Sequence, residues 1–311
     1  IALGINYFKT LVGSFKNWPV YYWMWGTGIV LMIYHFTEAH LWLLPYFREH
    51  FVQNLAMQWK AGGSYVGSWN MLVYGTAIYV MTKINGDDNY ARSSKAFFFY
   101  FLGLTNLMFG WAHHIYIVPT APWIRYLAYG ISMTEWIILF SIIYDWKRDL
   151  SKEKKTQFAL AFQFMLMADF WVFLNLVLAL LISIPAINLF THGTHITVAH
   201  SMGTTIGINT LILLSSITFI LESNHCFIAI RRIKTGIRIF HNSFILFWIS
   251  LLLMGVKKIY WSHFQPFLSF GKFQDSMHGL YLLFVFFGLG IFVGLALIVF
   301  ELLKNIKKQP F

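Results

Sequence analysis

Three histidines give this sequence its most specific chemistry, the binding of a metal ion or a haem. His113 and His114 are adjacent and lie five to six residues before Pro119, near the end of an apolar stretch. His200 lies at a similar distance from the end of another apolar stretch. Imidazole nitrogens are common ligands of transition metals and haem iron. The single cysteine, Cys226, excludes a disulfide framework and a Cys-x-x-Cys metal site, so any metal or haem is expected on histidine.

The elements that must position these histidines lie in a membrane. Hydrophobic residues make up 58% of the 311 positions, charged residues only 11%, and the mean hydropathy is +0.61. A water-soluble surface needs more charge than this. The net charge of +11 would otherwise suggest a nucleic-acid partner, but the basic residues form short clusters between long apolar runs. We therefore expect a lipid bilayer, and no nucleic acid, as a partner.

Eight apolar stretches are long enough to span a membrane, which takes about 20 residues. The linkers between them are short, and neither a soluble domain nor a repeat interrupts them. The sequence predicts an all-α integral membrane protein, with residues 1–311 forming a single transmembrane domain. The helices of this bundle are expected near 19–46, 61–82, 94–118, 122–144, 157–187, 195–221, 237–261 and 276–303.

Basic residues predict the orientation of these helices. Of the 23 lysines and arginines, 17 fall on the side that holds the N-terminus, and the other side holds only Arg48, Lys60, Arg125, Lys257, Lys258 and Lys272. Because positive charge collects in the cytoplasm, both termini are expected there, in a bacterial-type inner membrane. No cleavable signal peptide is evident, since Lys9 and Lys16 precede an apolar stretch long enough to span.

The three histidines are expected at one depth. In this topology the helix over 94–118 runs outward and the helix over 195–221 runs inward, which places His113, His114 and His200 roughly 8 Å below the outer surface. Adjacent helical residues point about 100° apart, so His113 and His114 share a metal only if it lies beside their helix. Two hydrogen-bonded interfacial histidines are the alternative for this pair. His200 is a candidate axial ligand of a haem that faces the metal.

Two motifs around these histidines resemble a known family. They are Gly110-Trp-Ala-His113-His114-Ile-Tyr and Thr191-His-Gly-Thr-His-Ile-Thr-Val-Ala-His200. Both are similar to the catalytic subunit of respiratory nitric oxide reductase, in the haem-copper oxidase superfamily. The eight expected helices resemble the last eight of the twelve in that family, and the resemblance extends to Asp275 through Gly288.

The resemblance implies roles for individual residues. His113 and His114 correspond to two of the three histidines on the non-haem iron of the family, or on another metal in its place. His200 corresponds to the axial ligand of the high-spin haem b that faces this iron. Glu135 falls on a family glutamate and is expected to take part in proton delivery during catalysis, although a carboxylate that is only hydrogen-bonded within the bundle is the alternative.

The sequence departs from the family at the third iron ligand. Reading back without a gap, the ligand position is Gly62, and the two family glutamates are replaced by Val66 and Asn70. Glycine has no side chain that can bind a metal. His40, in His40-Leu-Trp42, is a substitute ligand at a similar depth, or an interfacial histidine beside Trp42.

A second departure concerns the low-spin haem. The family has a histidine two residues after the high-spin haem ligand, and this chain has Met202 there. The early helix that carries the opposite ligand has no counterpart in this sequence. Methionine can bind haem iron, but an apolar packing role is the simpler interpretation. We therefore expect the low-spin haem to be absent.

Two hypotheses follow. In the first, the chain reduces nitric oxide or oxygen at a haem and a second metal, with electrons from a cytochrome subunit of the same respiratory complex. In the second, it is a structural paralogue, poor in cofactors, that packs against a complete catalytic subunit or another respiratory complex. A secondary transporter is disfavoured, because no pair of broken helices occupies corresponding halves.

Overall fold

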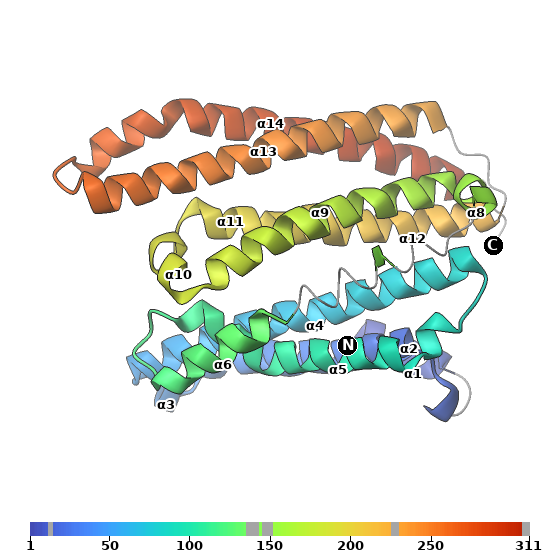
Figure 1. The fold of residues 1–311 in the computed structure, drawn as a ribbon, viewed down its shortest axis with the longest axis horizontal. Coiled ribbons are helices and arrows are strands. Elements are labelled where there is room, and N and C mark those ends of the chain that lie inside the picture. The colour runs from blue at the N-terminus through green and yellow to red at the C-terminus, as the bar shows by residue number, and fades with distance from the viewer. Residues whose placement is uncertain (12–14, 135–142, 145–151, 225–229, 307–311) are drawn as a thin grey trace. The chain divides into compact units, whose positions relative to one another are not determined.

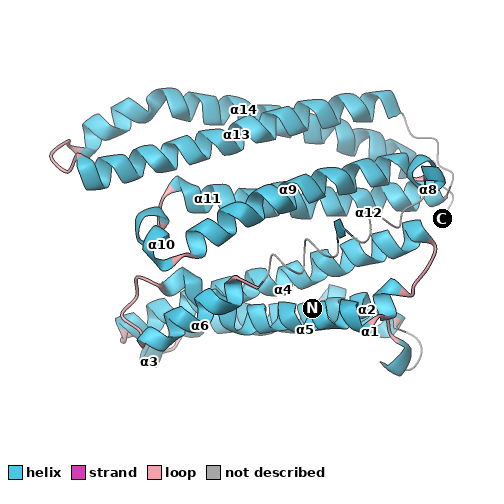
Figure 2. Cartoon of the chain, viewed as in Figure 1, coloured by secondary structure: helices cyan, strands magenta, loops and turns pink. Residues whose placement is uncertain are grey.

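The computed structural model of the chain describes residues 1–11, 15–134, 143–144, 152–224 and 230–306. These residues form helices, turns and loops, with no strand among them, which confirms the all-α prediction for this part of the chain (Figure 2). Two compact units can be distinguished. Unit 1 comprises Ile1–Lys155 and Ser183–Leu189, and unit 2 comprises Thr156–Ile182 and Phe190–Phe311. The single transmembrane domain over 1–311 stays a prediction.

The core of unit 1 lies between α2 (Val20–Ala39) and α4 (Phe51–Asn85), which run side by side (Figure 1). Val20, Met24 and Ile78 are buried in it. The helix α4 starts ten residues before the predicted range and ends at Gly86, whose φ of 71° suits a residue without a Cβ. Shorter elements complete this part of the unit: α1 (Ala2–Thr10), η1 (Phe15–Asn17), η2 (Leu41–Leu43), α3 (Pro45–Arg48) and η3 (Tyr90–Arg92).

The rest of unit 1 carries the adjacent histidines. The helix α5 (Ser94–Phe109) starts at Ser93, whose hydroxyl accepts the backbone N–H of Ala96 at 3.2 Å. It ends earlier than the predicted range 94–118, and the chain continues as a 3-10 helix, η4 (Gly110–Ile115). After a short loop, α6 (Pro122–Ser132) begins with proline in its first turn, where the missing N–H costs nothing.

Unit 2 is built from four long helical segments. These are α9 (Ala159–Ser183), the continuous run of α11 (His195–Met202), the π-helix η5 (Gly203–Asn209) and α12 (Thr210–Ser223), then α13 (Ile230–Phe264) and α14 (Phe270–Ile306). The short helices α8 (Lys152–Gln157) and α10 (Pro185–Thr191) lie where the chain passes between the units.

Close contacts between neighbouring helices hold unit 2 together, and two of them show how. The helices α13 and α14 form an antiparallel pair, and a Cβ on Gly294 would lie 2.5 Å from the backbone nitrogen of Phe240, so only glycine permits this approach. At the other contact, the Glu222 carboxylate at the end of α12 accepts the backbone N–H groups of Leu160 and Ala161, at 2.9 and 3.1 Å. This carboxylate satisfies donors that the first turn of α9 leaves open.

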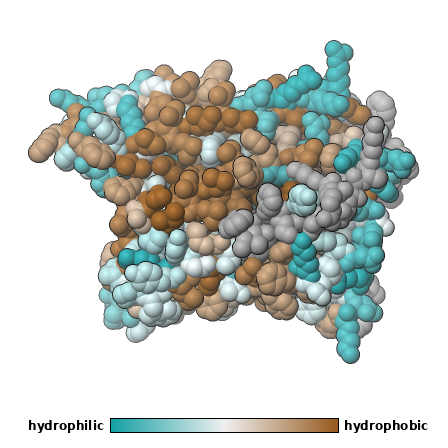
Figure 3. Space-filling view, viewed as in Figure 1, coloured by the Kyte–Doolittle hydropathy of each residue, from teal (hydrophilic) through white to brown (hydrophobic). Residues whose placement is uncertain are grey.

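Four segments among the described residues are long and apolar enough to cross a membrane: Ala159–Ser183, His195–Ser223, Ile230–Phe264 and Phe270–Ile306. Over α13 and α14 the surface is mostly hydrophobic, with hydrophilic side chains at the ends of the helices (Figure 3). The chain is an integral membrane protein. The count of eight spans is not confirmed, because α5 has only 16 residues and α2 is rich in tyrosine and tryptophan, which hydropathy ranks as weakly polar.

Candidate functional site

The adjacent histidines lie in η4 with their rings close together. The ring centroids of His113 and His114 are 4.2 Å apart, and the ring planes make an angle of 46°. The His113 Nδ1 is 3.1 Å from the hydroxyl of Ser132 on α6. The His114 ring stacks on Trp59 of α4, with 6.4 Å between centroids. The 3-10 helix therefore presents two imidazoles that are anchored on different neighbouring helices of unit 1.

The expected third ligand position faces open space. A Cβ on Gly62 would meet no atom within 4 Å. Its neighbour Gly63 is the residue that faces the pair, because a Cβ there would lie 3.0 Å from both His114 Cδ2 and Trp111 Cβ. The absence of a side chain at Gly63 lets His114 approach α4, while Gly62 contributes no donor atom.

His40 does not join this pair in a set of three ligands. It is exposed at the end of α2, where its Nδ1 is 2.7 Å from the carbonyl oxygen of Phe36 and its ring packs on the Phe36 ring. Within the described part of the chain, no three His, Cys, Asp or Glu side chains gather in a way that could hold a metal ion. Glu135 lies outside the described residues.

His200 lies on α11 in unit 2, and the motif before it builds the start of that helix. Gly193 has a φ of 68°, a conformation that favours glycine. Its carbonyl oxygen accepts a hydrogen bond from the Lys258 ammonium at 2.7 Å. The Thr194 hydroxyl then accepts the backbone N–H of Ile196 at 3.2 Å and caps the helix. Burial lowers the pKa of His192 in this turn below its usual value.

His200 lies on a stretch of α11 whose backbone is held by neighbouring helices. Its Nδ1 is buried and has no hydrogen-bond partner, a state that costs about 1–3 kcal/mol unless another group satisfies it. The backbone of this helix is fixed on two sides: Trp248 Nε1 donates to the carbonyl oxygen of Ala199 at 2.9 Å, and the Asn175 amide donates to Thr204 at 2.8 Å. Haem iron is bound by the Nε2 of a histidine, with Nδ1 left as a hydrogen-bond donor, so the open Nδ1 of His200 is compatible with a haem ligand and does not identify one. His113 and His114 alone are too few donors for a redox-active iron, which usually takes at least three protein ligands.

A buried charged cluster in unit 1 was missed by the sequence analysis. The Glu38 carboxylate, 9% exposed, lies 2.5 Å from the ammonium of Lys60 and 2.9 Å from His35 Nδ1. The His35 ring is almost fully buried, and its Nε2 has no partner. Glu38 is an acid near the end of an apolar stretch, which is the signal that could have drawn attention to it.

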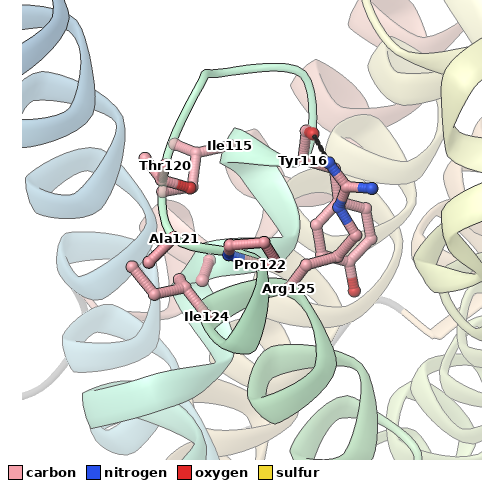
Figure 4. Close-up of a pocket in the computed structure, with 8 residues that line it drawn as sticks. Ile115, Tyr116, Thr120, Ala121, Pro122, Ile124 and Arg125 are labelled. Atoms are coloured by element: carbon pink, nitrogen blue, oxygen red, sulfur yellow. Dashed lines mark hydrogen bonds between the residues drawn. The ribbon is translucent and has the colours of Figure 1, made fainter.

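A small cavity lies beside η4 at the start of α6 (Figure 4). Its volume of about 10 Å³ suits a single water molecule at most. On its wall, the Arg125 guanidinium donates to the carbonyl oxygen of Tyr116 at 2.9 Å, and the Tyr116 hydroxyl donates to the carbonyl oxygen of Ser183 at 3.1 Å. This network fixes the loop after the two histidines and offers no room for a substrate.

Comparison with known proteins identifies the family. No curated protein matches the chain. The family model of the cytochrome c and quinol oxidase polypeptide I, however, matches residues 1–303. This match covers nearly the whole chain and confirms the predicted membership of the haem-copper oxidase superfamily. The chain therefore belongs to the cytochrome c and quinol oxidase polypeptide I family.

Proposed function

We propose that this chain is a structural membrane subunit of a respiratory complex, built on the haem-copper oxidase fold but without a dinuclear metal centre. Within the superfamily, the motifs at His113, His114 and His200 favour the nitric oxide reductase branch. In this role the chain packs against a complete catalytic subunit or another subunit of the respiratory chain.

The main support for this proposal is the absence of a ligand atom at Gly62. At the position of the third iron ligand of the family, the chain has no donor atom and its Cα faces open space. The family glutamates are replaced by Val66, which is exposed within this helix, and by Asn70. Two imidazoles would remain for the metal, and both rings are already held by neighbours, Ser132 and Trp59. We expect a site with only two imidazole ligands to lose iron during purification.

Metal analysis of the purified full chain tests the proposal. We expect well below one non-haem iron per chain in the wild type. Because Gly63 and not Gly62 faces the histidine pair, Gly62→His is expected to leave bound iron unchanged, and a gain of iron in this variant would contradict the arrangement of α4 in the structure. One non-haem iron per wild-type chain, lost in the variant His113→Ala/His114→Ala, would contradict the proposal.

A second candidate function, reduction of nitric oxide or oxygen, is favoured by His200. His200 has a buried Nδ1 without a hydrogen-bond partner, and its other ring nitrogen, Nε2, is the one that would bind the iron of a haem b. This hypothesis assigns one high-spin haem to His200 and a second metal to His113 and His114, with water in place of the third protein ligand. The haem would supply the redox chemistry, and Glu135 would carry protons.

The two candidates differ in their cofactors and in turnover. A reduced-minus-oxidised spectrum with haem quantification tests whether His200→Ala loses a haem that the wild type holds. One haem and one non-haem iron per chain, with consumption of nitric oxide from a cytochrome donor, would establish the reductase. Haem without iron and without turnover supports the structural subunit, as does the absence of both cofactors from the purified chain.

We also propose that both termini lie in the cytoplasm of a bacterial-type cell. The support is the charge asymmetry: 17 of 23 basic residues would lie on that side. Reporter fusions after Phe311 test it, because alkaline phosphatase is active only outside the cytoplasm and a fluorescent protein fusion should be bright only inside it. An active phosphatase fusion at that position would reverse the topology.

A further inference from the structure

One face of α13 carries three cations that have no acidic partner among the described residues. Arg231, Lys234 and Arg238 are spaced by three and four residues, which places them in one row on the helix. All three side chains are exposed, while Ile233 and Ile237 on the opposite face are buried. The row covers about 10 Å of the helix at 1.5 Å per residue.

The acidic residues of unit 2 are committed elsewhere. The sequence of this unit contains Asp169, Glu222, Asp275 and Glu301. Glu301 is buried and pairs with Arg232 at 2.9 Å and with Lys304 at 3.6 Å, and Glu222 accepts backbone N–H groups of α9. Asp169 is buried within α9, and Asp275 lies near the start of α14, at the other end of the α13 and α14 pair. Within the described part of unit 2, no acidic side chain is therefore available to the row.

The same face of α13 becomes apolar beyond the cations. Continuing at helical spacing, it presents Leu246, Ile249, Leu253 and Val256, with exposed fractions of 44%, 41%, 51% and 57%. A row of cations followed along one helix by an exposed apolar strip matches the order of groups in a phospholipid, with a charged headgroup and then acyl chains. An acidic protein segment that stays outside the membrane would match the cations but not this strip.

We propose that this face of α13 is a binding site for anionic phospholipid, in which Arg231, Lys234 and Arg238 hold the headgroup phosphates and the apolar strip holds the acyl chains. The guanidinium groups of two of these residues can contact phosphate oxygens through two N–H groups each. Arg232 is excluded from the site because Glu301 already holds it. This inference does not depend on the presence of a metal or haem.

The test measures the stabilisation of the full chain in detergent by phosphatidylglycerol and by phosphatidylcholine. Wild-type protein is expected to bind phosphatidylglycerol more tightly. The triple variant Arg231→Gln/Lys234→Gln/Arg238→Gln should lose about 100-fold of this preference, since each cation near an anionic surface contributes about fivefold. The matched control removes three exposed cations of unit 1, Lys9→Gln/Lys16→Gln/Arg48→Gln, and should keep the preference.

Three results would overturn the proposal. They are an unchanged preference in the triple variant, an equal loss in the control, and competition by inorganic phosphate alone at the same concentration, which would indicate a site for free anions. If the triple variant does not fold, wild-type protein at two salt concentrations decides the question. The preference should fall steeply from 0.01 M to about 1 M salt as charges are screened, and a preference that salt does not change contradicts the site.

Discussion

The buried pair of Glu38 and Lys60 allows a quantitative prediction. Lys60→Met removes the ammonium that lies 2.5 Å from a carboxylate with only 9% of its side chain exposed. Two unit charges about 4 Å apart attract by about 4 kcal/mol at an effective dielectric constant of 20. Removing one partner of a fully buried pair costs about 3–5 kcal/mol, but here Glu38 keeps His35 Nδ1 at 2.9 Å and Lys60 is 22% exposed. We therefore expect the free energy of unfolding to fall by about 2–3 kcal/mol in this variant.

A double variant at the same two positions separates the effect of charge from the effect of packing. The double variant Glu38→Gln/Lys60→Met leaves no unpaired charge and should recover to within about 1 kcal/mol of the wild type. Lys83→Met is the control. Lys83 Nζ lies 3.3 Å from an Asp88 carboxylate oxygen, and both side chains are more than a third exposed. This exposed ion pair should contribute at most about 1 kcal/mol. Unfolding is followed by tryptophan fluorescence during titration with a denaturing detergent. A loss below about 1 kcal/mol in Lys60→Met, or a double variant as unstable as the single one, would refute the reasoning.

Three further outcomes are expected from substitutions elsewhere. Gly62→Ala adds a methyl group in open space and should stabilise α4 by up to about 1 kcal/mol. In Gly67→Ala the new Cβ would lie 3.0 Å from a side chain of α5, and the resulting strain of about 1–3 kcal/mol should exceed that gain. Thermal unfolding of both variants checks the difference. Trp248→Phe removes one of two donors to the carbonyl of Ala199, which keeps the backbone N–H of Gly203, and should lower the free energy of unfolding by about 0.5–1.5 kcal/mol, measured in the same assay. The pKa of His192 is lowered in the folded state, so on acidification the unfolded state binds a proton at His192 before the folded state does. Stability should therefore fall as the pH drops below about 6.5. The variant His192→Gln should flatten this part of the pH profile of the melting temperature.

Much of the helical framework follows from the sequence, because a span needs a long apolar run and few residue types break one. The runs near 157–187, 195–221, 237–261 and 276–303 correspond to long helices of unit 2. The ends were less accurate: α4 begins at Phe51, where the sequence is amphipathic and polar residues weaken the apolar signal. The 3-10 helix at Gly110–Ile115 was not predicted, since its hydrogen-bond pattern depends on packing against α4 and α6.

The candidate site was predictable in its residue types but not in its contacts. The motifs indicated His113, His114 and His200, and the missing donor at Gly62 follows from the register alone. Sequence could not show that Gly63 is the glycine that meets His114, because that depends on the rotation of α4 about its axis. Nor could it join Glu38 to a lysine 22 positions away on another helix. Such pairings depend on tertiary packing.

The contact between Glu222 and α9 forms only after both segments have been synthesised, and α9 is synthesised first. The Glu222 carboxylate accepts two backbone N–H groups of the first turn of α9, and the contact at Leu160 spans 62 positions of sequence. A ribosome adds about 5–20 residues per second, so α9 leaves the ribosome roughly 3–12 s before its acceptor exists. During that interval the first turn of α9 must be satisfied by water or lipid headgroups at the membrane surface. The helix is therefore completed only when α12 has been made, and a pause in translation between the two would prolong the exposure of its open end.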